Sequence, residues 1–157
     1  MSLDLLLTSE VLDVHYDAAK AWLYLDWKGP QDLALVQAAC AQLSVLIQQT
    51  GAHKILNDNT HITETSWELA RWVAYDYLPQ AAEVGLEYVA WVHSPLLGSR
   101  SNVDLMSAFV DRKPQVAIFD EMAAAYEWLS SFAVPLDTES AAVDPDYIAA
   151  TALPLQK

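Results

Sequence analysis

The residues with the most chemical potential in this sequence are amides, carboxylates and hydroxyls grouped after a short apolar run. Four of them are consecutive: Asn57, Asp58, Asn59 and Thr60. Side chains of these types favour local hydrogen bonds to the backbone over the continuation of a strand. We therefore predict a strand over residues 53–57 that ends in this polar group, which is a candidate site for a ligand or a protein partner. The simpler interpretation is that these side chains only turn the chain.

A helix start follows the polar group. Thr65 and Glu68 have the spacing of a capping box, with Thr65 as the N-cap, and we predict a helix over residues 66–83. The point where a strand's carboxyl end leads into a helix is where open α/β sheets usually bind ligands. The candidate binding site therefore extends to Thr65, Ser66 and Trp67.

Other chemistry has weaker support in the sequence. His61 and His93 each follow a predicted strand and, with Asp58, would supply three metal ligands, but no closely spaced pair of histidines accompanies them. We predict neither a metal nor a cofactor. The sequence has four glycines and lacks a phosphate-binding glycine loop or a Gly-x-Ser-x-Gly motif. A non-enzymatic role is the first hypothesis, and a hydrolase is the third.

Composition limits the partners. The chain has 157 residues, 54% of them apolar, and a formal net charge of −13. This charge repels nucleic acid and anionic lipid, and the amino terminus has no run long enough to insert into a membrane. Cys40, the single cysteine, lies on the apolar side of a predicted helix, so we expect it to be buried. We expect a soluble cytoplasmic protein without disulfides.

The pattern along the chain predicts an α/β fold with elements in the order ββαβαβαβα. We expect a hairpin over residues 10–28, helices over 31–50, 66–83, 102–111 and from 121, and strands over 53–57, 86–92 and 115–119. Helices between strands require parallel neighbours, which gives an open, mixed, mostly parallel five-stranded sheet with 86–92 at its centre. Residues 1–132 form one domain in this prediction, and 133–157 form an acidic tail.

Large aromatic side chains are more numerous than one small core needs. Trp72 and Tyr75 lie off the apolar stripe of their predicted helix, which is typical of a contact surface. If most helices cover one face of the sheet, the other face needs cover. A second copy of the chain is our first prediction, which makes the protein a homodimer. A small apolar ligand and the tail are the alternatives.

Several stretches together resemble a known family. The segment KILNDNTHITETSW, the strand LEYVAWV and the closing QVAIFDEMAAAYEWLSS are similar to the SpoIIAA-like branch of the STAS family. The similarity covers roughly residues 10–132.

This resemblance implies a regulatory module that binds a protein partner or a small molecule and is not an enzyme. In anti-sigma-factor antagonists of the family, a serine at the start of the corresponding helix is phosphorylated. Ser66 matches that position and Thr65 is its neighbour, but Trp67 replaces the family's glycine. We expect partner binding through residues 57–67 and the exposed aromatics, with Ser66 and Thr65 as candidate phosphorylation sites.

Overall fold

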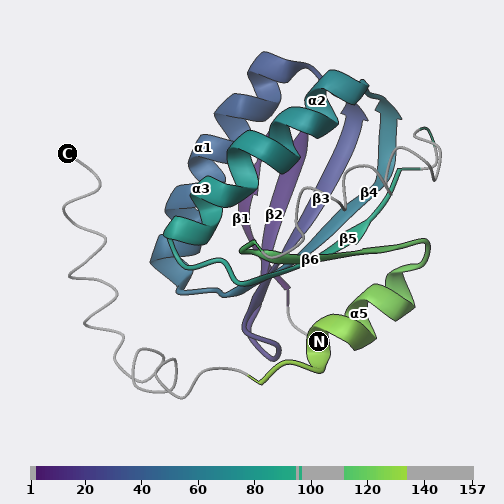
Figure 1. Ribbon diagram of the computed structural model, residues 1–157. Helices are drawn as coiled ribbons and strands as arrows, with labels where there is room; N and C mark the ends of the chain where they lie inside the picture. The colour runs from purple at the N-terminus through teal and green to yellow at the C-terminus, as the bar shows by residue number, and fades with distance from the viewer. Residues whose placement is uncertain (1–2, 95, 97–111, 134–157) are drawn as a thin grey trace, which may run out of the picture.

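The computed structural model describes residues 3–94, 96 and 112–133. Its core is one six-stranded sheet in the order β1-β2-β3-β4-β5-β6, so each strand lies beside its neighbours in sequence (Figure 1). The strands are β1 (Leu3–Thr8), β2 (Leu12–Asp17), β3 (Trp22–Pro30), β4 (Lys54–Glu64), β5 (Tyr88–Val92) and β6 (Gln115–Phe119). The α/β class predicted from the sequence is confirmed.

The amino-terminal part of the sheet differs from the prediction. β1, β2 and β3 form an antiparallel meander, and β3 to β6 are parallel. The predicted five strands become six because Leu3–Thr8 pairs with β2. The strand over 86–92 is also not central: β5 lies next to the edge strand β6. Its apolar sequence reflects cover by helices on both faces rather than a central place.

β4 is the second correction. It does not end at residue 57 but continues through the polar group to Glu64, and it stays paired with β3 up to Pro30. The polar side chains do not divert the backbone because they find partners on either face of the sheet. Asn57 accepts a hydrogen bond from Trp27, and Asp58 accepts one from Tyr24.

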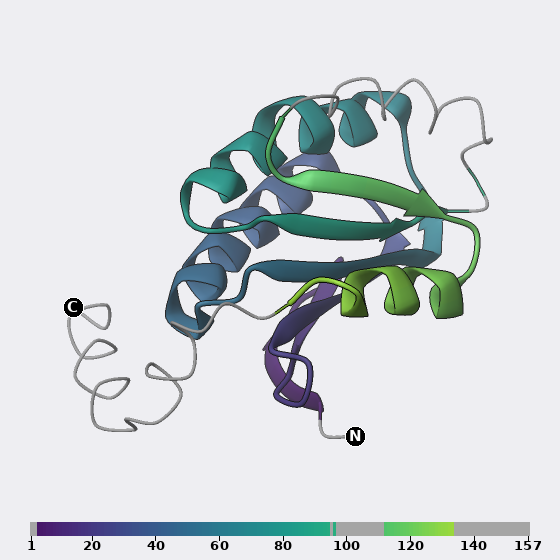
Figure 2. The ribbon, with the colours of Figure 1, turned by 60° about the horizontal axis from the view of Figure 1, so that its bottom comes forward.

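Helices cover the two faces of the sheet unequally. One face carries α1 (Leu33–Thr50) and the helical segment α2 (Trp67–Trp72), η1 (Val73–Tyr77) and α3 (Leu78–Glu83) (Figure 1). The opposite face carries α5 (Met122–Ser130), which packs on β4 to β6 (Figure 2). The expectation that this face needs cover from a second copy, a ligand or the tail is therefore wrong over β4 to β6, where α5 provides it.

The main core lies between the sheet and the first set of helices. α1 contributes its buried side to this core: Val36, Ala39, Cys40, Leu43 and Ile47. Cys40 is 1% exposed, as predicted, and burial raises the pKa of its thiol to about 12. By length and composition α1 alone would also suit a membrane span, but this buried face packs on the sheet as a core helix does.

The helix after β4 continues past Pro79. A π-helical turn separates α2 from α3, and in it the Leu78 amide donates to the carbonyl of Val73, five residues earlier. Proline lacks an amide donor and crowds the preceding turn, so a regular α-helix would be interrupted at this place. The wider turn absorbs that disruption, and Pro79 falls in the first turn of α3.

Two predictions fall outside the described residues. The helix predicted over 102–111 lies in the segment 97–111, and all but residue 133 of the tail lies beyond the end of the described part.

Candidate functional site

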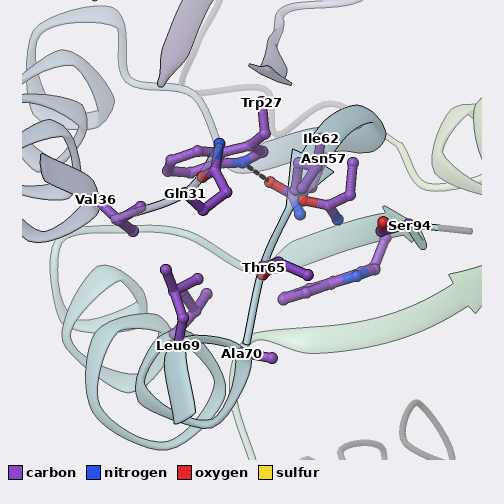
Figure 3. Close-up of a pocket in the computed structure, with 12 residues that line it drawn as sticks. Trp27, Gln31, Val36, Asn57, Ile62, Thr65, Leu69, Ala70 and Ser94 are labelled. Atoms are coloured by element: carbon purple, nitrogen blue, oxygen red, sulfur yellow. Dashed lines mark hydrogen bonds between the residues drawn. The ribbon is translucent and has the colours of Figure 1, made fainter. Parts of the chain in front are cut away.

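A pocket opens beside the carboxyl ends of β3 and β5, between the sheet and helices α1 and α2 (Figure 3). Its cavity volume is about 30 Å³, and about 460 Å³ of empty space lies among the lining residues when open solvent is included. Twelve residues line it: Trp27, Gln31, Val36, Asn57, Asn59, Ile62, Thr65, Leu69, Ala70, Val73, Trp91 and Ser94. The pocket wall combines indole rings and aliphatic side chains with a few amides and hydroxyls, which is the composition of small-molecule sites.

The sheet register explains why the pocket lies there. β4 is paired with β5 only as far as the Asp58–Val92 pair, yet β4 continues beside β3 to Glu64. Beyond Val92 the β5 side of β4 has no strand neighbour in the described part of the chain. Asn59 partly replaces that neighbour, because its Nδ2 donates to the Val92 carbonyl at 3.1 Å. The remaining space between the strand extension and α2 forms the pocket.

Asn57 is the central polar group of the pocket. It is 6% exposed, and its Oδ1 accepts a hydrogen bond from the Trp27 indole Nε1 at 2.6 Å (Figure 3). This contact fixes the orientation of the amide. The Asn57 Nδ2 has no hydrogen-bond partner among the described residues and is not sealed from solvent. The pocket therefore presents a pre-oriented donor against largely apolar walls.

The predicted site residues separate into two groups. Asn57, Asn59 and Thr65 line the pocket. Asp58 faces the opposite side of the sheet, since side chains alternate along a strand. It is 2% exposed, and its oxygens accept hydrogen bonds from the Tyr24 hydroxyl and from Thr60. Asp58 and Thr60 thus lie apart from the pocket.

The helix start also differs from the prediction. The N-cap is Ser66, not Thr65: Ser66 Oγ accepts a hydrogen bond from the Leu69 amide at 3.2 Å, and α2 begins at Trp67. Because α2 begins at Trp67, Glu68 is its second residue and not the third, which a capping box requires. Thr65 instead lines the pocket. Phosphorylation of Ser66 or Thr65 stays a prediction.

The predicted contact aromatics behave differently from one another. Trp67 and Tyr75 are 40% and 42% exposed, and the Arg71 guanidinium lies over the Tyr75 ring. Trp72 is half-buried, stacks on Tyr77 and packs against the main core. Trp72 is therefore mainly a structural residue, whereas Trp67 and Tyr75 remain on the surface.

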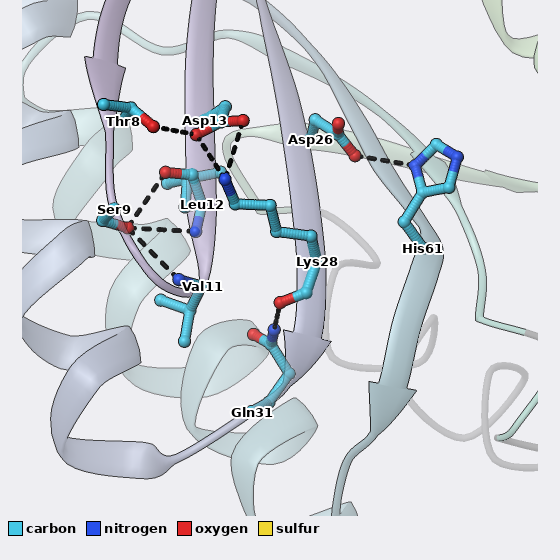
Figure 4. A network of polar contacts seen from close by, with 9 residues as sticks. All are labelled: Thr8, Ser9, Val11, Leu12, Asp13, Asp26, Lys28, Gln31 and His61. Atoms are coloured by element: carbon cyan, nitrogen blue, oxygen red, sulfur yellow. Dashed lines mark hydrogen bonds and ion pairs between the residues drawn. The ribbon is translucent and has the colours of Figure 1, made fainter.

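His61 does not join His93 in a metal site. Within the described residues, His61 lies with Asp26 and Asp58, whose ligand atoms are all within 4.8 Å of one another. His61 Nδ1 contacts Asp26 Oδ1 at 2.8 Å (Figure 4). Both oxygens of Asp58 already accept hydrogen bonds, and Asp26 is paired with an imidazole. These hydrogen bonds explain why the three side chains lie together.

The His61–Asp26 pair gives a testable pH dependence. The hydrogen bond and charge of Asp26 raise the pKa of His61 above its ordinary 6.5. A raised histidine pKa stabilises the folded state below the unfolded pKa, and that contribution is lost as the pH rises through the folded pKa. We expect an NMR titration to give His61 a pKa above 6.5, and Asp26→Asn to return it toward that value. An unchanged titration in Asp26→Asn would contradict the pairing.

A second network stabilises the edge of the sheet. Lys28 Nζ contacts both oxygens of Asp13 at 2.8 and 2.9 Å, and the Thr8 hydroxyl donates to Asp13 (Figure 4). Burial would raise the pKa of Asp13, but these hydrogen bonds hold it below 3.8. The network links β1, β2 and β3 and is not part of the pocket.

His93 is placed poorly for hydrolysis. Its Nε2 contacts the Asp120 carboxylate, and its Nδ1 lies 3.2 Å from the Ser94 carbonyl. Both ring nitrogens thus face oxygen acceptors, and neither is directed at a serine hydroxyl in the described residues. A general base needs a nitrogen within reach of the proton it removes. This geometry does not support the hydrolase hypothesis.

Sequence reasoning missed much of the pocket wall. Trp27, Ile62, Leu69 and Trp91 line the pocket but were not identified as site residues. Trp27 comes from β3 and Trp91 from β5, so they meet across β4 only through the parallel register. The alternation along β3 was the available signal, since it places Trp27 on the same face as Leu23 and Leu25.

No family model matches this sequence, and no curated protein matches it. A structure search finds apo-SiaC from Pseudomonas aeruginosa, at 13% sequence identity and a TM-score of 0.43. The match covers 75% of this chain and 98% of the SiaC chain. A similarity this distant assigns neither a family nor a partner nor an activity to this chain.

Proposed function

We propose that this chain is a non-enzymatic binding module whose pocket takes a small, neutral, largely apolar molecule with a carbonyl acceptor. The observation that carries the proposal is the Asn57 amide, whose oxygen is engaged by Trp27 while its Nδ2 is left without a partner in the described residues. A ligand oxygen would satisfy that donor. A non-enzymatic module that binds a small molecule agrees with the resemblance of the sequence to the SpoIIAA-like branch of the STAS family.

The chemistry of the wall supports a neutral ligand. Among the described residues, no Asp, Glu, Lys, Arg or His lines the pocket. A charged group placed there would lose its hydration without gaining a counter-charge, which is strongly unfavourable. The net charge of −13 further disfavours an anion. A neutral carbonyl needs only a hydrogen-bond donor, and Asn57 supplies one.

Calorimetric titration with benzamide and benzoate tests this proposal. The two probes share a ring of the same size and differ in the charge of the polar group. We expect benzamide to bind and benzoate to bind at least about tenfold more weakly, which corresponds to about 1.4 kcal/mol. Binding of benzoate as tight as that of benzamide, or binding of neither probe, would contradict the proposal.

The exposed aromatics of α2 and η1 favour a second candidate function, the docking of a protein partner on the outer side of this helical segment. Trp67 and Tyr75 form its apolar part, and Arg71 lies over the Tyr75 ring. Aromatic and arginine side chains are enriched at such interfaces. A Trp67→Ser, Tyr75→Ser double variant should keep benzamide affinity and lose chemical cross-links to a cellular partner. Unchanged cross-links would exclude this surface.

A further inference from the structure

The amino-terminal strand β1 is an open edge of the sheet. It pairs with β2 on one side and with no strand on the other within the described part of the chain. In Figure 2 it lies at the opposite end of the sheet from β6. Every residue of β1 except Leu7 is exposed. The outer row of backbone amides and carbonyls of β1 is therefore available for pairing.

The side chains of β1 are unusually apolar for an open edge. Leu3, Leu5 and Leu6 are 43%, 57% and 39% exposed, and they are three of the eight large hydrophobic residues exposed in the described part of the chain. Proteins usually protect such edges with lysine, proline or a bulge. β1 has no lysine or proline, and its protective features are limited to the exposed Asp4 and a register shift between Leu5 and Leu7.

We infer that β1 is a self-association surface, through which two copies of this chain pair antiparallel and join their sheets into one. A strand added to an open edge is held by main-chain hydrogen bonds. With the two-fold axis at Leu5, the Leu5 side chains of the two copies lie beside each other and each Asp4 lies one residue away from the axis, on the regular side of the register shift between Leu5 and Leu7. No carboxylate within the paired strands then faces another carboxylate.

Charge favours a second copy over an unlike partner. A basic partner would bind where the carboxylates of this acidic chain, with its net charge of −13, are concentrated. β1 holds only one carboxylate, Asp4, so it is a poor site for such a partner. β1 is thus a place where two acidic molecules approach with little local repulsion. A two-fold contact of this kind stops at a dimer, because the β1 edge of each copy is then occupied by the other. The remaining long-range repulsion weakens as salt screens it.

Sedimentation equilibrium on the full chain tests this inference. We expect a reversible dimer whose dissociation constant falls as the salt concentration rises. Leu5→Lys should shift the equilibrium to monomer by at least about tenfold in dissociation constant, because like charges would meet at the axis. The matched control is Leu35→Lys, which changes an equally apolar residue, 42% exposed, on α1 and should leave the dimer intact.

Disulfide trapping gives a second readout that does not depend on the lysine variant folding. Leu5→Cys should form a symmetric disulfide dimer on treatment with diamide, whereas Leu35→Cys should not, and the native Cys40 is too buried to interfere. A wild-type monomer at all salt concentrations, or equal dimer content in both lysine variants, would overturn the inference. Benzamide binding does not enter these measurements, so their outcome is independent of the pocket.

Discussion

Replacing Asn57 with leucine should weaken benzamide binding about tenfold and lower the free energy of unfolding by about 1–3 kcal/mol. Leucine has a similar shape but no polar atoms. The binding loss follows because the free Nδ2 donor disappears from the pocket. The stability loss follows because Trp27 Nε1, which donates to Asn57 Oδ1 at 2.6 Å, is left without an acceptor in a buried position.

A double-mutant cycle isolates the part of the stability loss that comes from the hydrogen bond between Trp27 and Asn57. Trp27→Phe removes the indole donor, so the pair Asn57→Leu with Trp27→Phe contains no unpaired polar group. Replacing both partners of a buried hydrogen bond costs less than removing one of them. We expect urea unfolding to show that the double variant is more stable than the sum of the single effects predicts. Simple additivity would show that the two side chains do not depend on each other.

Replacing Trp22 with alanine should cause the largest loss of stability, about 3–5 kcal/mol. Trp22 is 1% exposed and belongs to the core beneath α5, where its ring meets Tyr126 edge-on at 5.0 Å. The Nζ atoms of Lys20 and Lys54 also lie near its ring, at 5.9 and 5.8 Å. A loss of this size is a large fraction of a typical domain's stability.

Trp67→Ala provides the matched control, since it removes the same side chain from a position that is 40% exposed. Substitutions at such positions usually change stability by about 0.5 kcal/mol or less. Chemical unfolding of both variants gives the comparison. Equal losses from Trp22→Ala and Trp67→Ala would contradict the three-layer arrangement in which α5 covers the second face of the sheet over β4 to β6.

The fold could be predicted from the sequence where local periodicity is strong. The hairpin of β2 and β3, helix α1 with its buried Cys40, and the last strand and helix follow from apolar spacing. β1 was missed because its leucines do not alternate with polar residues, and it becomes a strand only by pairing with β2. Tertiary pairing of this kind leaves little local signal.

The candidate site could be predicted only in part, for a related reason. The polar residues after Leu56 were expected to end the strand, since their local preference is for turns. Contacts distant in sequence reverse that preference: Trp27 holds Asn57, and the Val92 carbonyl holds Asn59. The sequence indicated the correct stretch of chain, but which side chains share a face depended on β4 continuing to Glu64.

NMR mapping of the benzamide site tests the central claim most directly. The account predicts that benzamide shifts the side-chain amide signals of Asn57 and the indole N–H signals of Trp27 and Trp91, while those of Trp22 and Trp67 stay in place. Shifts confined to Trp22 or Trp67, or no shift in the Asn57 side chain at saturating benzamide, would contradict it.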